Sequence, residues 1–356
     1  MSGSAARTAT ADVVCLGESM VTFLPSQPGR LADVPSFGRG IGGAESNVAC
    51  ALAAAGHRSK WVGRVGADGF GDHLVDAIAG YGVDTSAVRR DPDRPTGIYF
   101  RTSTDRATDA HEVAYYRAGS AASAMSPHNV PYDDLLATRV LHLSGITAAL
   151  SADCLALLHD LTAARDDRPL VSFDVNHRPG LWREGETGPE VLLDLARRSD
   201  LVFVGEDEAE EAWGVHGTEA IRAALPEPDV LVVKRGSDGV TVFSRTGEAT
   251  ADGPARDTVT TVPSLRVDVV AAVGAGDAFA AGFLSATLRD LPVRDRARHG
   301  HLMAAAVLTV PGDLTGPPPR AYADRLAALD DEAWGTLRLG PGWTVADGAN
   351  EEVRVT

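Results

Sequence analysis

The sequence predicts a three-layer α/β protein with a doubly wound, mostly parallel sheet and a small β-sheet lid. Short apolar runs alternate with Ala- and Leu-rich stretches, which is the order expected for strands separated by helices. The apolar runs are continuous, which indicates strands buried on both faces, as in a parallel sheet between helices. With 356 residues, 44% of them hydrophobic, the chain can bury one large core.

The elements follow one another between residues 12 and 329, which we expect to form one domain. Strands are expected at Val13–Leu16, Leu141–Leu143, Leu170–Phe173, Leu201–Val204 and Val230–Val233. Helices are expected at Ser46–Ala55, Asp72–Ala79, Cys154–Ala164 and Val191–Arg197, directly after Asp277, and around Arg298–Leu308. The polar segment 1–11 and the Gly-rich, acidic segment 330–356 are expected to be weakly ordered terminal extensions.

Two segments, at about 20–40 and 96–118, interrupt this alternation. In the second segment, two β-rich runs flank a polar stretch. Each segment follows an element of the core, so we expect both to form a small sheet beside the main domain. Such a sheet could cover the carboxyl ends of the strands, where open α/β folds bind ligands.

Neither nucleic acid nor a membrane is an expected partner. The formal net charge is −16 and the isoelectric point is near 5.0, so phosphate backbones and anionic lipids would be repelled. No window has the roughly 18 consecutive apolar residues that a membrane-spanning helix needs. Cys15, Cys50 and Cys154 lie in apolar sequence, which is typical of buried thiols in a reducing compartment. We therefore expect a cytoplasmic protein.

The strongest local signal is a glycine-rich turn, Gly274-Ala275-Gly276, that leads through Asp277 into an Ala-rich helix. Amide groups at such a helix start can bind an anion, and glycine lets a phosphate approach closely. Asp277 has two interpretations. It can cap the helix, or its carboxylate can accept the proton of an attacking hydroxyl as a general base. The turn alone does not decide between them.

A second glycine-rich turn also precedes a helix. Gly42 and Gly43 are followed by Glu45 and Asn47 in the first turn of an Ala-rich stretch. This segment can simply connect a strand to a helix, or it can leave backbone edges open to sugar hydroxyls while polar side chains orient the ligand. On its own it does not decide either.

Together and in this order, the two turns resemble the two signatures of the ribokinase-like (pfkB-type) carbohydrate kinases, over roughly residues 13–329. The resemblance implies a ribokinase-like fold and ATP-dependent phosphorylation of a sugar. It places Asp277 at the catalytic base. It places Gly274, Ala275 and Gly276 at the anion hole, whose amides stabilise charge on the transferred phosphoryl group.

Further segments look like the 2-keto-3-deoxygluconate kinases of that family: GIYF at 97–100, YYRAGS at 115–120 and FDVNHRP at 173–179. In those enzymes lid tyrosines and arginines surround a sugar acid, whose carboxylate a guanidinium can bind through two parallel hydrogen bonds. The implied reaction phosphorylates the C6 hydroxyl of 2-keto-3-deoxygluconate to give 2-keto-3-deoxy-6-phosphogluconate. The implied substrate-binding residues are Gly42, Gly43, Asn47, Tyr99, Tyr115, Arg117, Ile146, Arg178 and Asp313.

ATP and Mg²⁺ are expected beside the anion hole. The segment 231–239 resembles the strand and turn that meet ATP in the family, although a plain β-hairpin explains the same pattern. The resemblance assigns Lys234, Gly236 and Gly239 to ATP, together with Gly274 and Gly276 of the anion hole. Glu208 aligns with a glutamate that helps to organise Mg²⁺, but Gly205 stands where the family has asparagine.

One departure concerns a monovalent cation. Ala271 stands where the family commonly has an aspartate that helps to hold this cation, and a methyl group cannot coordinate one. We therefore expect either no K⁺ activation through that position or a cation held by backbone carbonyls alone. Asp268 lies three residues upstream, and the sequence does not show whether it substitutes.

Two alternatives to a sugar-acid kinase stay open. A kinase for a neutral ketose such as fructose, or for a related deoxy sugar, would be favoured if Arg117 and Arg178 pair with protein carboxylates. The other alternative is a catalytically silent sugar-binding protein of the same fold. As in the family, we also expect the lid to serve as a subunit contact in a homo-oligomer.

Overall fold

The fold is built on one large sheet in the computed structural model, which describes residues 9–102, 112–166, 168–182, 188–246 and 256–345. Its strands are β1 (Ala11–Leu16), β4 (Ser59–Val62), β9 (Thr138–Ser144), β10 (Leu170–Asp174), β11 (Leu201–Gly205), β12 (Val230–Lys234), β13 (Val240–Thr246) and β14 (Arg256–Val262). Their spatial order is β14-β13-β12-β11-β10-β9-β1-β4. All neighbours from β4 to β12 pair in parallel, and β13 and β14 are antiparallel.

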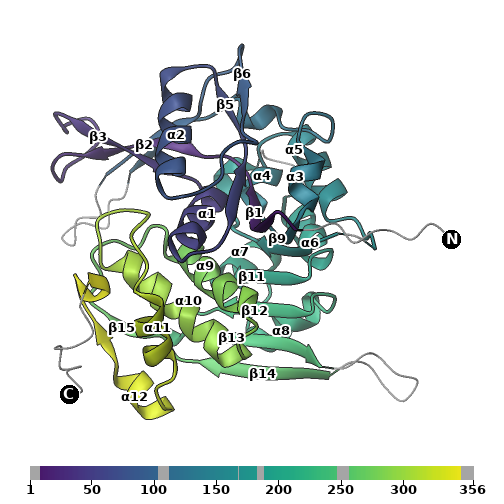
Figure 1. The fold of residues 1–356 in the computed structure, drawn as a ribbon, viewed down its shortest axis with the longest axis vertical. Helices are drawn as coiled ribbons and strands as arrows, with labels where there is room; N and C mark the ends of the chain where they lie inside the picture. Colours follow the sequence, from purple (N-terminus) through teal and green to yellow (C-terminus); the bar gives the residue numbers. More distant parts are fainter. Residues whose placement is uncertain (1–8, 103–111, 167, 183–187, 247–255, 346–356) are drawn as a thin grey trace.

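Helices cover both faces of this sheet (Figure 1). Alternate residues of a strand enter different cores, since Val13 and Cys15 pack on one face and Val14 and Leu16 on the other. The first face is covered by α1 (Ala44–Ala54), α2 (Gly69–Gly80), α9 (Ala275–Leu288), α10 (Val293–Leu308) and α11 (Arg320–Ala327). The second is covered by α3 (Tyr132–Leu136), α4 (Gly145–Ala148), α5 (Ala152–Leu161), α6 (Gly188–Arg197), α7 (Glu206–Trp213) and α8 (Thr218–Ala224). The predicted three-layer α/β fold is confirmed.

A small separate sheet, which we call the lid, is also present as predicted. It consists of β2 (Met20–Pro25), β3 (Phe37–Gly42), β7 (Ile98–Arg101) and β8 (Val113–Tyr116) in the order β3-β2-β7-β8. In Figure 1, β2 and β3 project from the main body at the upper left. Residues 103–111, within the predicted lid segment 96–118, lie outside the described residues. A further strand pair joins β5 (Arg64–Gly66) to β6 (Arg89–Asp91).

Capping side chains explain why two helices begin earlier than predicted. The Asp68 carboxylate accepts hydrogen bonds from the amides of Phe70 and Gly71, so α2 begins at Gly69. Ser151 accepts one from the amide of Cys154, so α5 begins at Ala152. Such caps satisfy amides that have no partner within the helix. No helix of the described chain is long and apolar enough to cross a membrane.

The C-terminal segment departs from the prediction of a weakly ordered extension. Within it, α12 (Asp331–Thr336) and β16 (Arg338–Leu339) pack on the main body, and β16 pairs in parallel with β15 (Arg266–Val267). Trp334 is 0% exposed, with the guanidinium carbon of Arg298 4.6 Å from its ring centroid. Gly-rich composition suggested disorder, but Trp334 and the buried side chains of Leu337, Leu339 and Trp343 hold the segment on the core. Residues 1–8 and 346–356 lie outside the described residues.

Candidate active site

A cleft of about 730 Å³ lies where the lid faces the carboxyl ends of the parallel strands. The structure brings most of the predicted site residues together in it. Those that line the cleft are Gly42, Gly43, Asn47, Tyr99, Tyr115, Arg117, Ile146, Arg178, Glu208, Lys234, Gly274, Gly276, Asp277 and Asp313. The predicted residues Ala275, Gly236 and Gly239 are not among the lining residues.

Asp277 lies in the first turn of α9 and faces the cleft. The N-cap of α9 is Gly274, and no side chain caps this helix, so the interpretation of Asp277 as a cap is wrong. Its Oδ2 accepts a hydrogen bond from Asn47 Nδ2 at 2.9 Å. Burial raises the pKa of Asp277 to about 7; the bond from Asn47 lowers it and the nearby Asp174 raises it. A carboxyl with a pKa near neutrality can exchange protons at physiological pH.

Gly274 shapes the turn in front of Asp277. Its φ is +82°, in the left-handed region that side chains disfavour. A Cβ atom there would lie 2.6 Å from the carbonyl oxygen of Asp313, so a larger residue would displace the Asp313 loop. This packing places the first turn of α9 at the cleft. The amides of that turn lack intrahelical partners.

Lys234 is the one positive side chain that the end of β12 brings into the cleft. Its Nζ lies 3.2 Å from Oδ1 of Asp174 at the end of β10. Burial alone would lower the pKa of Lys234, but Asp174 and Glu208 outweigh it and raise that pKa. A lysine that stays charged beside a helix N-terminus suits a polyphosphate.

The turn after Lys234 has a structural explanation that does not involve the cleft. It joins β12 to β13 as an antiparallel hairpin, and both of its glycines, Gly236 and Gly239, have positive φ. A Cβ at Gly239 would lie 2.2 Å from the carbonyl oxygen of Val262. The hairpin interpretation of this segment is therefore confirmed.

The two predicted carboxylate-binding arginines are not equivalent. Arg117, at the end of β8, forms a buried ion pair with Glu18, which also accepts a 2.6 Å hydrogen bond from Ser120. Arg178 is 53% exposed and its Nη1 is 3.7 Å from Oε1 of Glu208. Both arginines therefore have a protein carboxylate as partner. The pair of Arg117 is buried, whereas the longer pair of Arg178, whose Nη1 also donates to the carbonyl oxygen of His177 at 2.8 Å, leaves about half of that side chain exposed.

A buried polar network closes the lid end of the cleft. Asp313 accepts a 3.1 Å hydrogen bond from the Tyr99 hydroxyl and forms a 2.5 Å ion pair with Arg101 of β7. A Cβ at Gly42 would lie 2.3 Å from the Tyr99 hydroxyl, so glycine there makes room for this network. The pair between Arg101 and Asp313 ties the lid to the loop that supports Gly274.

Glu45 is fully buried in α1 behind the cleft and does not line it. Thr147 of α4 donates a 2.6 Å hydrogen bond to its Oε1. Burial raises the pKa of Glu45 to about 8, although the bond from Thr147 lowers it. Burial and the nearby Asp277 therefore favour the protonated form of Glu45.

The residues present fit Mg²⁺ bound together with a nucleotide. Mg²⁺ usually takes one or two carboxylates and completes its coordination with phosphate oxygens and water. Glu208 lines the cleft and uses Oε2 to accept a hydrogen bond from the amide of Gly205. Its Oε1, 3.7 Å from Arg178 Nη1, is the oxygen that a cation would share with that arginine. The part of the chain that the structure describes has no cluster of three or more His, Cys, Asp or Glu residues that could hold a metal by itself.

Asp268 contacts the C-terminal segment, because its Oδ1 lies 2.6 Å from Arg338 in β16. This pair does not test whether Asp268 substitutes for the missing aspartate. The expectation that K⁺ does not act through residue 271 stays a prediction.

Several polar residues of the site were missed from the sequence. They are Glu18, Asp174 and Asn176, which line the cleft, and Arg101, which lies behind it. Asp174 and Asn176 directly follow an apolar strand, a position that could have marked them. Asn176 also has a φ of +44°, which is rare outside glycine and concentrates at functional sites. Glu18 and Arg101 carried no such signal.

Comparison with known proteins agrees with this geometry. The model of the pfkB family of carbohydrate kinases matches residues 10–320. The 2-dehydro-3-deoxygluconokinase of Bacillus subtilis (strain 168) is 35% identical over 87% of this chain and 93% of its own length. That of Thermoproteus tenax is 32% identical over 89% of this chain and 94% of its own length.

Neutral-sugar kinases are also relatives. Fructokinase-1 of Zea mays is 30% identical over 78% of this chain and 83% of its own length. Among solved structures, a PfkB protein from Polaromonas sp. JS666 superimposes with a TM-score of 0.75, at 32% identity over 88% of this chain and 99% of that one.

Proposed function

Because the chain belongs to the pfkB family of carbohydrate kinases and is a sugar kinase, we propose that its substrate is the sugar acid 2-keto-3-deoxygluconate (2-dehydro-3-deoxygluconate). The observation that carries the reaction type is Asp277, held by Asn47 at the start of α9 in a cleft that the lid covers. The curated 2-dehydro-3-deoxygluconokinases, and the half-exposed side chain of Arg178 in the cleft, support the sugar acid.

In the proposed reaction, Asp277 accepts the proton of the sugar's C6 hydroxyl. The oxygen forms a bond to the γ-phosphorus of ATP while the bond to the β-phosphate oxygen breaks and ADP leaves. The amides of Gly274, Ala275 and Gly276 and the ammonium of Lys234 stabilise charge on the transferred group. Mg²⁺, held through Glu208, would neutralise phosphate charge when bound. The lid excludes water, which would otherwise compete as acceptor.

A neutral ketose is the second candidate substrate, and it is favoured by the pairing of both Arg117 and Arg178 with protein carboxylates. The charge of Arg117 is balanced by Glu18, so this arginine offers less to a substrate carboxylate than an unpaired one would. Glu18 also lines the cleft, where a carboxylate can accept hydrogen bonds from sugar hydroxyls.

The experiment that tests the proposal is ADP formation with Mg·ATP against 2-keto-3-deoxygluconate, fructose and ribose in parallel. We expect turnover with the sugar acid at a kcat/KM at least tenfold above that with fructose. A reversed order would assign the enzyme to neutral sugars. Sugar binding without turnover would favour the silent sugar-binding protein.

Replacing Glu18 by Gln separates the two substrate classes. Loss of the buried negative charge beside Arg117 should lower KM for the sugar acid by about tenfold, because the charge of Arg117 would then be balanced by the substrate carboxylate instead of by Glu18; tenfold corresponds to about 1.4 kcal/mol. KM for fructose should not fall. Steady-state kinetics with both sugars measures this, and an unchanged or higher KM for the sugar acid would show that Arg117 does not bind its carboxylate.

We further propose that the lid is a contact between subunits. Aromatic side chains gather on it: Phe23 stacks on Phe100 at 4.7 Å between ring centroids, and Tyr116 is 65% exposed next to them. Exposed aromatic residues are enriched at protein interfaces. Light scattering of the purified protein should give at least twice the chain mass. A monomer mass, or an oligomer unaffected by Tyr116→Ser, would contradict this contact.

A further inference from the structure

Asn47 contacts the catalytic carboxylate directly. It lies in the first turn of α1, is 4% exposed, and its Nδ2 donates to Asp277 Oδ2 at 2.9 Å. The reverse orientation of the amide would place its oxygen against a carboxylate oxygen, which is repulsive. The observed orientation is therefore the one that the charge of Asp277 selects.

We propose that Asn47 is a positioning residue for the base: its amide occupies Oδ2 of Asp277, so that Oδ1 is the oxygen that receives the proton of the sugar hydroxyl. This inference rests on the proposed phosphoryl transfer to a sugar. It gives Asn47 a role beyond the sugar contact expected for its position in the sequence.

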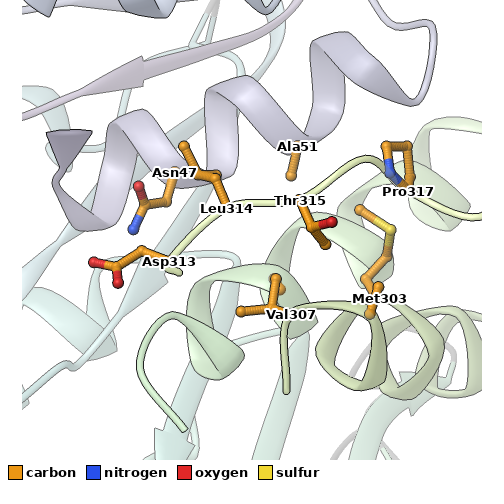
Figure 2. A pocket seen from close by; sticks show the side chains of 10 residues that line it. Asn47, Ala51, Met303, Val307, Asp313, Leu314, Thr315 and Pro317 are labelled. Atoms are coloured by element: carbon orange, nitrogen blue, oxygen red, sulfur yellow. The ribbon is translucent and has the colours of Figure 1, made fainter. Parts of the chain in front are cut away.

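The surroundings of Asn47 leave its amide few other contacts. Behind it lies a small cavity of about 10 Å³, and Figure 2 shows Asn47 and Asp313 together at one end of the lining. The remaining lining is mostly apolar: Ala51, Ala278, Met303, Ala306, Val307, Leu314 and Pro317, with Thr315 as the other polar side chain. Helix α1 therefore presents Asn47 to Asp277 from a largely apolar wall.

The second polar atom of the amide is free to meet the substrate. Asn47 Oδ1 is buried and has no hydrogen-bond partner among the described residues. A buried acceptor without a donor is costly, so a ligand donor at that place would be favoured. A sugar hydroxyl that donates to Oδ1 would hold the Asn47 amide in this orientation, and the amide would in turn hold the Asp277 carboxylate through Nδ2.

Several charged or titratable groups face Asp277, and they set the sign of the expected pH effect. Burial, Asp174 of β10 and the nearby Glu45 favour the protonated carboxyl, while Asn47, Lys234 of β12 and Arg178 favour the carboxylate. Removing the Asn47 donor shifts this balance toward the protonated form, which cannot accept a proton. Activity should fall at neutral pH and recover as the pH rises.

The test compares kcat from pH 5 to 9, at saturating Mg·ATP and sugar, for the wild type, Asn47→Leu and Asn47→Asp. In both variants we expect kcat at pH 7 to fall about tenfold. The acid limb of the pH–rate profile, where kcat falls as Asp277 becomes protonated, should move up by about one pH unit. The titration of the nucleotide is common to all three proteins. Ala51→Ser, one helical turn further on and outside the cleft, is the matched control and should leave the acid limb in place.

An acid limb that stays in place while KM for the sugar rises would overturn the proposal and leave Asn47 as a sugar contact only. Asn47→Asp keeps the shape of the side chain, which covers the case in which Asn47→Leu does not fold.

A second readout needs no activity, so it separates this inference from the proposed function. The thermal stability lost in Asn47→Leu should be greater at pH 8.5 than at pH 5.5 in the ligand-free protein, because the bond is stronger to the ionised carboxylate. A loss that does not depend on pH would contradict the inference even if no sugar is turned over.

Discussion

Asp277→Asn should lower kcat by about 10²–10⁴-fold with little change in KM for the sugar. General-base catalysis contributes rate factors of this size, and an amide of the same shape can still accept the hydrogen bond from Asn47 Nδ2 while being unable to take a proton. Initial rates of ADP formation at saturating sugar measure the effect. Activity above one tenth of the wild-type value would mean that another group accepts the proton.

The same substitution should stabilise the ligand-free protein at high pH. Burial, and to a smaller extent Asp174, raise the pKa of Asp277 to about 7 from an ordinary value of 3.8. The folded state therefore binds this proton more tightly than the unfolded chain does. Its contribution to stability is therefore full below about pH 4 and is lost as the pH rises through 7.

Asparagine resembles the neutral form at every pH, so the difference in Tm in favour of Asp277→Asn should grow between pH 4.5 and pH 8. Asp76→Asn, an exposed carboxylate on α2, should show no such trend. A difference in Tm that is constant with pH would mean that Asp277 is already ionised in the folded protein at pH 4.5. Ionising a buried carboxylate lowers the stability of the protein, and such a cost is typical of catalytic sites.

Trp334→Ala should lower the free energy of unfolding by about 3–5 kcal/mol, the usual cost of removing a buried aromatic side chain. Trp334 is 0% exposed, its Nε1 donates to the carbonyl oxygen of Pro263 at 3.0 Å, and its ring lies against Arg298. For a chain of this size the fall in Tm should be of order 10 °C. Thermal unfolding followed by circular dichroism or calorimetry measures it.

Val345→Ala is the matched control, since Val345 is in the same segment but 82% exposed; its Tm should match that of the wild type. A shift below about 2 °C in Trp334→Ala would show that α12 contributes little to the fold. Because β16 pairs with β15 only a few residues before the Gly274 turn, we also expect the damaged segment to loosen the anion hole and raise KM for ATP.

Local sequence was sufficient for the fold class, and with the family resemblance it also predicted the residues that bear directly on the chemistry. Continuous apolar strands predict a parallel sheet, because such strands must be buried on both faces. The glycines before Asp277 and before Asn47 mark turns where backbone amides meet a ligand. The turns alone did not decide between a structural and a catalytic role; their combination, through the resemblance to the carbohydrate kinases, predicted a cleft containing Asp277, Lys234 and Arg178.

The tertiary structure alone decided which polar and charged side chains meet. Glu18 pairs with Arg117, Arg101 with Asp313, and Asn47 with Asp277, across 212 residues in the second case and 230 in the third. It also placed Trp334 in the core. Ion pairs and core contacts between distant segments depend on how helices and the lid pack on the sheet, and neither composition nor periodicity encodes that packing. For this reason the base was predictable from the sequence, whereas its neighbours, and the balance of charge that selects a sugar acid or a neutral sugar, were not.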